Sequence, residues 1–181
     1  MEKENLQVAT FAGGCFWCTE AVFDAIKGVN KVISGYTGGH IKNPAYREIT
    51  SGRTGHAEAV QIFYNEEEVS FVTLLEVFFA THDPTTLNRQ GYDVGTQYRS
   101  EVFYNTDLQR EQTIEFISLL EREEVFNENI VTKISPLDAF YRAEEEHQDF
   151  YKNNSEYRYC QLVIEPKLDK IKKFYSDKLK A

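Results

Sequence analysis

Two cysteines, Cys15 and Cys18, lie three residues apart in the segment GGCFWC, residues 13–18. A strand-like apolar run, residues 8–12, precedes the segment and a helical pattern follows it, so we expect Cys15 to lie at a helix start. The partial positive charge and free N–H groups there stabilise a thiolate and lower its pKa. The two glycines allow a sharp turn. We therefore predict that Cys15 is a reactive nucleophile rather than a buried, inert thiol.

Two large aromatic residues, Phe16 and Trp17, directly follow Cys15. Core packing is the simpler interpretation of either residue alone. Beside a reactive thiol, however, the pair could form an apolar cage for a small group such as a methyl. Contacts between sulfur and aromatic rings would favour a thioether or sulfoxide ligand.

Glu58 lies in an alternating segment, residues 57–64, on one face with Val60 and Ile62. We expect this carboxyl group to point toward the apolar side, where partial burial raises its pKa and suits it to act as a general acid. The alternative is an exposed carboxylate on a strand. His56, two residues earlier, is expected to line the same site. The other histidines are interpreted as surface or structural residues: His40, His82 and His147.

Four segments in order resemble the peptide-methionine (S)-S-oxide reductase family: GCFWCTE, GYTGG, NPAYREITSGRTGHAEAV and QGYDVGTQYRSEVFY. AEEEHQDFY and YCQLVIEPKL are weaker matches. The resemblance implies an oxidoreductase that reduces the S-diastereomer of methionine sulfoxide, free or in proteins, and so repairs oxidised proteins. It implies electrons from thioredoxin or another dithiol and no cofactor or metal.

The resemblance also implies roles for individual residues. Cys15 matches the family's nucleophile, and Phe16 and Trp17 match the substrate-binding pocket for the ε-methyl group. Glu58 matches the acid that protonates the sulfoxide oxygen. After attack on sulfur, Cys15 would become a sulfenic acid, the reversible first step of thiol oxidation.

Tyr46 and Tyr98 match the family's hydroxyl groups that bind the sulfoxide oxygen, and Asp93 matches an acid that organises the site. From the residues alone these assignments are weak, because most tyrosines in a tyrosine-rich chain simply pack. Gly91 and Gly95 around Asp93 also suit an ordinary turn.

The resolving thiol, which must condense with the sulfenic acid, has two candidates. Many family members have glycine where this chain has Cys18, with resolving cysteines near the C-terminus. Cys18 lies one helical turn from Cys15, whereas Cys160 lies in a strand-like segment that favours a structural role. We predict Cys18 as the resolving thiol, with Cys160 as the alternative.

Two other functions compete with this interpretation. CFWC at a helix start is also the arrangement of a general thiol–disulfide oxidoreductase, in which Tyr46, Glu58 and Tyr98 would have no role. A structural zinc module could use the three cysteines and a histidine, but Cys160 lacks the paired neighbour that such sites usually show.

The net charge of the chain restricts the classes of partner that it can bind. The 181 residues carry a net charge of −9, and the basic run 167–173 alternates with Leu168 and Ile171, which is typical of a helix face in solvent. We therefore exclude nucleic acid. No apolar run approaches the ~20 residues that span a membrane, and the segment MEKENLQVATFAGG lacks signal-peptide features. Three cysteines, an odd count, do not form a secreted disulfide framework, so we expect the reducing cytoplasm. We also expect a monomer.

These residues require a scaffold that places distant segments together. We predict a single catalytic domain over residues 1–181, of the α+β class: a two-layer α/β sandwich with a ferredoxin-like plait core, a mainly antiparallel sheet and long functional loops. Strands are expected at 8–12, 29–36, 57–64, 101–104 and 158–164. Helices are expected after Cys15, at 69–80, from Thr106, from Ser135-Pro136 and from Pro166. The loops are 37–55 and 82–98.

Overall fold

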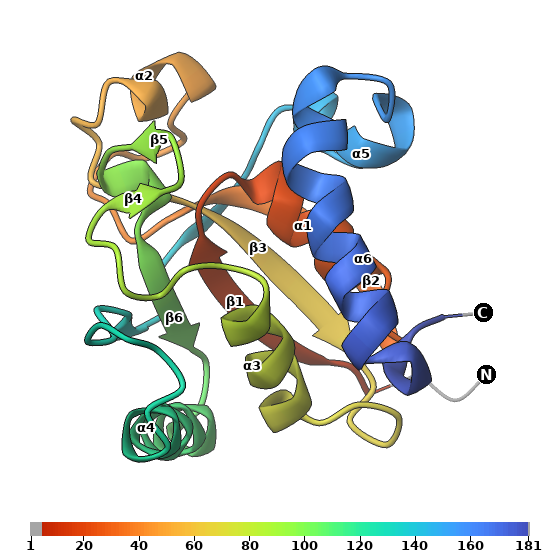
Figure 1. Cartoon of the computed structure of the whole chain (residues 1–181). Coiled ribbons are helices and arrows are strands. Elements are labelled where there is room, and N and C mark those ends of the chain that lie inside the picture. The colour runs from red at the N-terminus through yellow and green to blue at the C-terminus, as the bar shows by residue number, and fades with distance from the viewer. Residues whose placement is uncertain (1–4, 181) are drawn as a thin grey trace.

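The computed structural model describes residues 5–180 and is built on a six-stranded sheet (Figure 1). The sheet order is β7-β6-β1-β3-β2-β8. Four strands form the centre of this sheet: β1 (Gln7–Gly13), β2 (Val29–Thr37), β3 (Ala57–Tyr64) and β6 (Ser100–Tyr104). Two short strands, β7 (Lys133–Pro136) and β8 (Phe140–Arg142), lie at its edges. All neighbours are antiparallel except β6 and β7, so the sheet is mixed.

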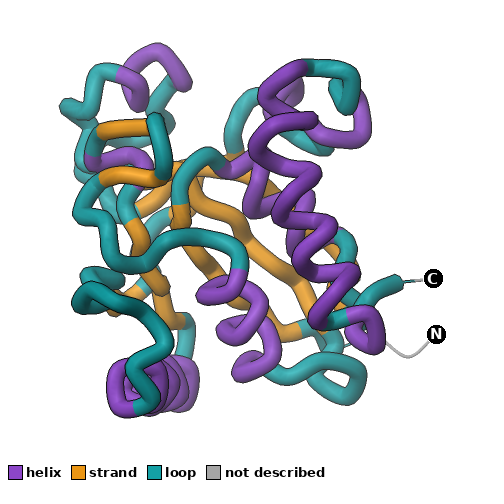
Figure 2. The backbone as a smooth tube through the Cα atoms, viewed as in Figure 1, coloured by secondary structure: helices purple, strands orange, loops and turns teal. Residues whose placement is uncertain are grey.

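Helices pack on the sheet and bury its central strands (Figures 1 and 2). The longer helices are α1 (Phe16–Asp24), α3 (Phe71–Ala80), α4 (Asp107–Arg122) and α6 (Glu165–Phe174). The shorter ones are α2 (Tyr46–Thr50), α5 (Phe150–Asn153) and 3-10 turns at Thr96–Tyr98, Glu145–His147 and Ser176–Lys178. The core forms around Phe11 of β1, whose ring lies 5.6 Å from that of Phe23 and 4.8 Å from that of Phe78. This packing fixes α1 and α3 against β1.

The mixed α+β class is confirmed, but the helix expected from Ser135-Pro136 is wrong. These residues end β7, which pairs in parallel with β6. Pro136 lies at the end of an edge strand, where a missing N–H costs no ladder hydrogen bond. Ser135 donates its hydroxyl proton to Glu101 at 2.6 Å instead of capping a helix.

The strand expected at 158–164 is also wrong. Residues Cys160–Ile164 form a π-helical turn that continues directly into α6. Cys160, Ile164 and Ile171 are all buried, at a spacing that matches a helix rather than a strand. Packing of this face against α1 overrides the β-branched composition of the segment.

The two long loops contain short elements of their own. The 37–55 loop carries α2, and the 82–98 loop carries the hairpin of β4 (Arg89–Gln90) and β5 (Asp93–Val94). Both loops lie at the same end of the sheet, beside the start of α1 (Figure 1). The fold thus brings two distant loops to the GGCFWC turn.

Candidate active site

Cys15 is the N-cap of α1, and one residue, Gly14, separates it from the end of β1. The preceding Gly14 has a φ of +96°, and a Cβ there would lie only 2.7 Å from the Gln90 side chain. Glycine is therefore required at this turn. Cys15 is half-buried, and Cys15 and Cys18 both line a groove of about 1000 Å³. The expected position of Cys15 at a helix start is confirmed.

Glu58 reaches the same helix start from β3. Its Oε1 accepts a hydrogen bond of 3.2 Å from the backbone N–H of Phe16, and only 2% of the residue is exposed. Burial raises the Glu58 pKa to about 8, although the hydrogen bond from Phe16 opposes this rise. The carboxyl group is thus largely protonated near neutral pH, and the predicted burial and raised pKa are confirmed.

The predicted lowering of the Cys15 pKa is wrong. Burial raises the pKa of this thiol well above its usual value, and its hydrogen bond to Cys18 and the charge of Glu58 raise it further. The same hydrogen bond lowers the Cys18 pKa to about 7. Burial thus opposes the effect of the helix start, which alone does not create a Cys15 thiolate.

The two aromatic side chains after Cys15 have different neighbours. The Trp17 ring stacks on Phe150 with a centroid distance of 3.7 Å and an interplanar angle of 7°. Its Nε1–H donates to Nδ1 of His147 at 3.1 Å. Phe16 is fully buried and packs against Tyr36, with ring centroids 5.6 Å apart. Trp17, which is only partly buried, presents an apolar wall fixed by a hydrogen bond and a ring stack.

A polar network connects this wall to the tyrosines. Glu144 accepts hydrogen bonds from the Tyr36 hydroxyl at 3.1 Å and from the Tyr46 backbone N–H at 3.2 Å. Nε2 of His147 lies 3.5 Å from Glu144, and the ring of His147 lies 4.5 Å from that of Tyr46. Burial lowers the His147 pKa, so the neutral ring keeps Nδ1 free to accept from Trp17.

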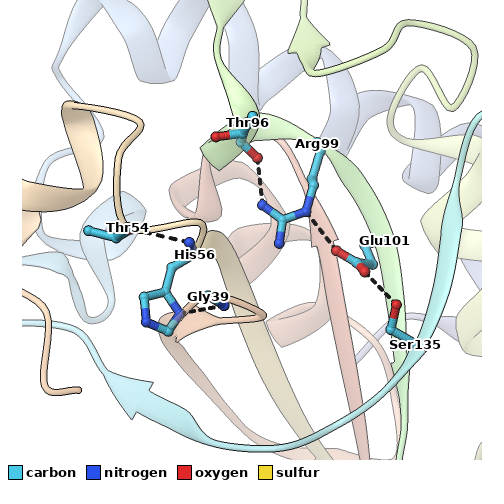
Figure 3. Close-up of polar contacts among 7 residues, drawn as sticks. All are labelled: Gly39, Thr54, His56, Thr96, Arg99, Glu101 and Ser135. Carbon is cyan, nitrogen blue, oxygen red and sulfur yellow. Dashed lines mark hydrogen bonds and ion pairs between the residues drawn. The ribbon is translucent and has the colours of Figure 1, made fainter. Parts of the chain in front are cut away.

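Tyr46 and Tyr98 lie close enough to Glu58 and Cys15 for the charges of these groups to affect both phenols. Burial raises the pKa of both phenols, and the charges of Glu58 and Cys15 raise both further. Tyr98 ends a 3-10 turn that Arg99 anchors by donating to the Thr96 carbonyl at 2.8 Å (Figure 3). Both hydroxyls therefore remain protonated and can donate hydrogen bonds to an oxygen atom in the site.

Arg99 in turn is paired with Glu101 at 2.7 Å, and both residues are buried (Figure 3). Arg99 directly precedes β6, Glu101 lies on this strand, and the contacts extend through Ser135 to β7. The Tyr98 turn is thus tied to the sheet.

His56 is buried, and both of its ring nitrogens contact the 37–55 loop. Nδ1 accepts from the Gly39 N–H at 3.0 Å (Figure 3), so Nε2 carries the proton and donates to the Ile41 carbonyl at 2.6 Å. These contacts orient the loop that carries Tyr46.

Asp93 lies on β5 and is connected to the cysteine pair through Tyr159. The Tyr159 hydroxyl donates to Asp93 Oδ2 at 3.4 Å and lies 3.4 Å from Cys18 Sγ. Burial raises the Asp93 pKa. Cys160 is fully buried, and it packs in a cluster with Cys18 rather than beside a solvent channel.

Sequence reasoning missed four residues that contact the site: Tyr36, Glu144, His147 and Tyr159. The segments AEEEHQDFY and YCQLVIEPKL contain three of them and were the available signal. His147, expected from the sequence to be a surface or structural residue, is buried and accepts from Trp17, a contact that only the fold reveals.

The described residues contain neither a metal-binding cluster nor a membrane-spanning helix. Among residues 5–180, no three His, Cys, Asp or Glu side chains lie together in a way that could hold a metal ion. Within the same range, no helix combines the length and apolarity needed to cross a membrane.

Known proteins with similar sequences or folds share one family. The model of the peptide methionine sulfoxide reductase family matches residues 7–179. The peptide methionine sulfoxide reductase MsrA of Deinococcus radiodurans is 54% identical over 95% of this chain and 84% of its own length. Reduced Mxr1 from Saccharomyces cerevisiae is 32% identical with a TM-score of 0.78, covering 86% of this chain and 89% of that one.

A second structure shows Mxr1 in complex with Trx2. It aligns with a TM-score of 0.55 at 25% identity, covering 80% of this chain and 84% of Mxr1. Together with the family match over nearly all residues and the Cys15–Glu58 site, these similarities establish one conclusion: the chain belongs to the peptide methionine sulfoxide reductase family.

Proposed function

We propose that this protein reduces the S-diastereomer of methionine sulfoxide, free or in proteins, with Cys15 as nucleophile. The observation that carries the proposal is the protonated Glu58 carboxyl group bound to the Phe16 N–H, next to Cys15. Trp17 supplies an apolar wall for the substrate's methyl group. The S-specificity rests on family membership.

The chemistry transfers one oxygen atom. Glu58 donates its proton to the sulfoxide oxygen, and the Tyr46 and Tyr98 hydroxyls donate hydrogen bonds to it. As the oxygen gains this proton, Cys15 attacks the substrate sulfur, and the Cys15 proton returns the Glu58 carboxylate to its acid form. The S–O bond of the substrate and the bond between the two sulfur atoms then break, and the hydroxyl oxygen forms a bond to the Cys15 sulfur. Methionine leaves as the thioether, and Cys15 becomes a sulfenic acid. The substrate sulfur is reduced by two electrons and Cys15 is oxidised by two.

Recycling requires a second thiol and an external dithiol. We assign Cys18 as the resolving thiol, because its backbone N–H donates to the Cys15 carbonyl at 3.1 Å, one helical turn away, and its pKa is already lowered. Cys160 clusters with Cys18 and is the alternative. A thioredoxin then reduces the disulfide by thiol–disulfide exchange. The complex of yeast Mxr1 with Trx2 supports a partner of this class.

The proposal is tested by supplying each diastereomer of methionine sulfoxide to the reduced protein with a thioredoxin system. We expect methionine from the S-form only. Reduction of insulin disulfides is measured in parallel, because a general thiol–disulfide oxidoreductase would reduce insulin without reducing sulfoxide. That outcome, or methionine from neither diastereomer, would overturn the proposal.

The proposal also covers the topology of the fold, the extent of the catalytic domain and the roles of the remaining site residues. The order β1-α1-β2-β3-α3-β6 with sheet neighbours β6-β1-β3-β2 supports a ferredoxin-like plait at the core of a two-layer sandwich. The family match over residues 7–179 supports one catalytic domain over 1–181. His56 and Asp93 act as positioning residues, and the reaction needs no cofactor besides the dithiol. A cytoplasmic monomer stays a prediction.

A further inference from the structure

We infer that Tyr159 and Lys167 form an activating site for Cys18, which makes this thiol the nucleophile that attacks the Cys15 sulfenic acid. The inference rests on the proposed function, because it requires Cys18 to be the resolving thiol. Both residues come from the segment YCQLVIEPKL, for which the sulfoxide-reducing step itself has no use.

Tyr159 contacts the Cys18 sulfur directly. Its hydroxyl oxygen lies 3.4 Å from Cys18 Sγ and 3.4 Å from Asp93 Oδ2, so it bridges the thiol and the carboxylate. Its ring packs edge-on against Trp17, with centroids 5.8 Å apart at 81°. Burial raises the Tyr159 pKa, so the hydroxyl keeps its proton. The group can therefore turn from Asp93 to Cys18 and donate when the sulfur becomes a thiolate.

Lys167 approaches Cys18 from the first turn of α6. Lys167 and Cys18 line both the large groove and a narrow cleft beside Gly13 and Phe23. The hydrogen bond from Cys15 lowers the Cys18 pKa most, and the positive charge of Lys167 lowers it further. Once Cys15 is oxidised, its thiol proton is gone and that hydrogen bond is lost. Lys167 and Tyr159 are then the groups that still stabilise the thiolate.

The other ionisable groups around Cys18 oppose a thiolate or are neutral. Asp93 raises the Cys18 pKa by its charge, and the Glu58 carboxyl group is uncharged while its proton is bound. Cys160 remains a neutral thiol because burial raises its pKa. His82, in the narrow cleft, is neutral because burial lowers its pKa to about 3. Lys170, which lines the same groove, donates its ammonium group to the Ala80 carbonyl. Lys167 is therefore the cation on which the thiolate depends.

Tyr159 and Lys167 assist the formation of the Cys15–Cys18 disulfide, a step in which atoms and electrons balance. The Cys18 thiolate attacks the Cys15 sulfur, an S–S bond forms and the S–O bond breaks. The leaving hydroxide takes up the proton that the Cys18 thiol lost, and the product is water. Cys18 is oxidised by one electron equivalent and Cys15 is reduced by one, so no external oxidant or reductant is needed until thioredoxin arrives.

The first test measures two rates after the reduced protein is mixed with methionine sulfoxide without reductant. One is the release of methionine, and the other is the subsequent loss of the Cys18 thiol. Tyr159→Phe should slow the second rate by about tenfold or more relative to the first, since it removes a hydrogen bond to a charged group. Tyr157→Phe, which changes an exposed tyrosine two residues before Tyr159, is the matched control.

The second test uses pH. Lys167→Gln should shift the midpoint of disulfide formation upward by roughly one pH unit, and Lys167→Arg should restore it, because only a cation stabilises the thiolate. Lys172→Gln, exposed on the same helix, is the control. These profiles separate an electrostatic effect from loss of structure.

The experiments distinguish a wrong assignment of Cys18 from a wrong assignment of its activating site. A Cys15–Cys160 disulfide in wild type would overturn the assignment of Cys18. A Cys15–Cys18 disulfide that forms at the wild-type rate and pH midpoint in both Tyr159→Phe and Lys167→Gln would overturn only the activating site.

Discussion

The Glu58 carboxyl group accepts the backbone N–H of Phe16 at 3.2 Å, one residue after the nucleophile. Because Oε1 is used in this bond, Oε2 is free to carry the proton toward a bound oxygen. Burial of Glu58 keeps that proton in place near neutral pH. The same carboxyl group disfavours a premature Cys15 thiolate. Acid and nucleophile are therefore both neutral until a substrate arrives.

Glu58→Gln should slow the sulfoxide-reducing step by roughly 10²-fold, because the amide keeps the shape but cannot deliver a proton. In wild type, this step should lose its acid as the pH rises through about 8, and the variant should lack that decline. Single-turnover methionine formation over pH 5 to 9 measures both effects. Glu66→Gln, an exposed carboxylate after β3, is the control. A wild-type rate in Glu58→Gln would assign the acid role elsewhere.

The same variant should be more stable than wild type at alkaline pH. The Glu58 pKa rises from its usual 4.5 to about 8 on folding, so the native state binds this proton more tightly than the unfolded chain. The stability that the protonated Glu58 contributes to the native state is complete below pH 4.5 and is lost as the pH rises through about 8. The stability of Glu58→Gln relative to wild type should thus increase by on the order of 3 kcal/mol between pH 5 and 9. Denaturant unfolding at both pH values measures this, and an unchanged difference would contradict it.

Trp17 is the only tryptophan in the chain, so its fluorescence reports directly on the apolar wall. His147→Leu removes the acceptor of its Nε1–H, which lies 3.1 Å away. We expect a shifted emission maximum and a KM for sulfoxide raised about tenfold, as for the loss of a buried hydrogen bond. His147→Asn can place an oxygen near the Nδ1 position and should recover part of both signals. Unaltered emission and KM in the Leu variant would show that His147 does not position Trp17.

The assignment of Cys18 as the resolving thiol predicts that Cys18→Ser and Cys160→Ser lose different amounts of thioredoxin-supported activity. Cys18→Ser should complete one turnover but lose most thioredoxin-supported turnover, because the sulfenic acid has no adjacent partner. Cys160→Ser should lose little. Mass mapping of the oxidised wild type should find Cys15 joined to Cys18. Normal recycling in Cys18→Ser would transfer the resolving role to Cys160.

Several parts of the site could be predicted from the sequence because their chemistry is local. The GGCFWC turn lies between a strand and a helix, and the alternation of residues 57–64 placed Glu58 on the apolar side. Both inferences need only one element and its immediate neighbours. The raised Glu58 pKa follows from the same burial.

Other features depend on contacts between distant segments. The raised Cys15 pKa arises from burial and from Cys18, which a helix-start argument does not include. His147 and Phe150 reach Trp17 from an irregular segment in which Asp149 has a φ of +51°. No periodicity indicates such a segment. The β-branched composition of residues 158–164 concealed a helical spacing that only packing against α1 makes visible.

The central claim is that Cys15 receives the oxygen of the substrate. It is tested most directly with sulfoxide labelled with heavy oxygen and a Cys18→Ser, Cys160→Ser protein, in which the sulfenic acid has no resolving thiol. Mass spectrometry of the quickly trapped protein should find one labelled oxygen on Cys15 for each methionine formed, and Cys15→Ser should form no methionine. Methionine formed without labelled Cys15, or by a folded Cys15→Ser protein, would contradict the account.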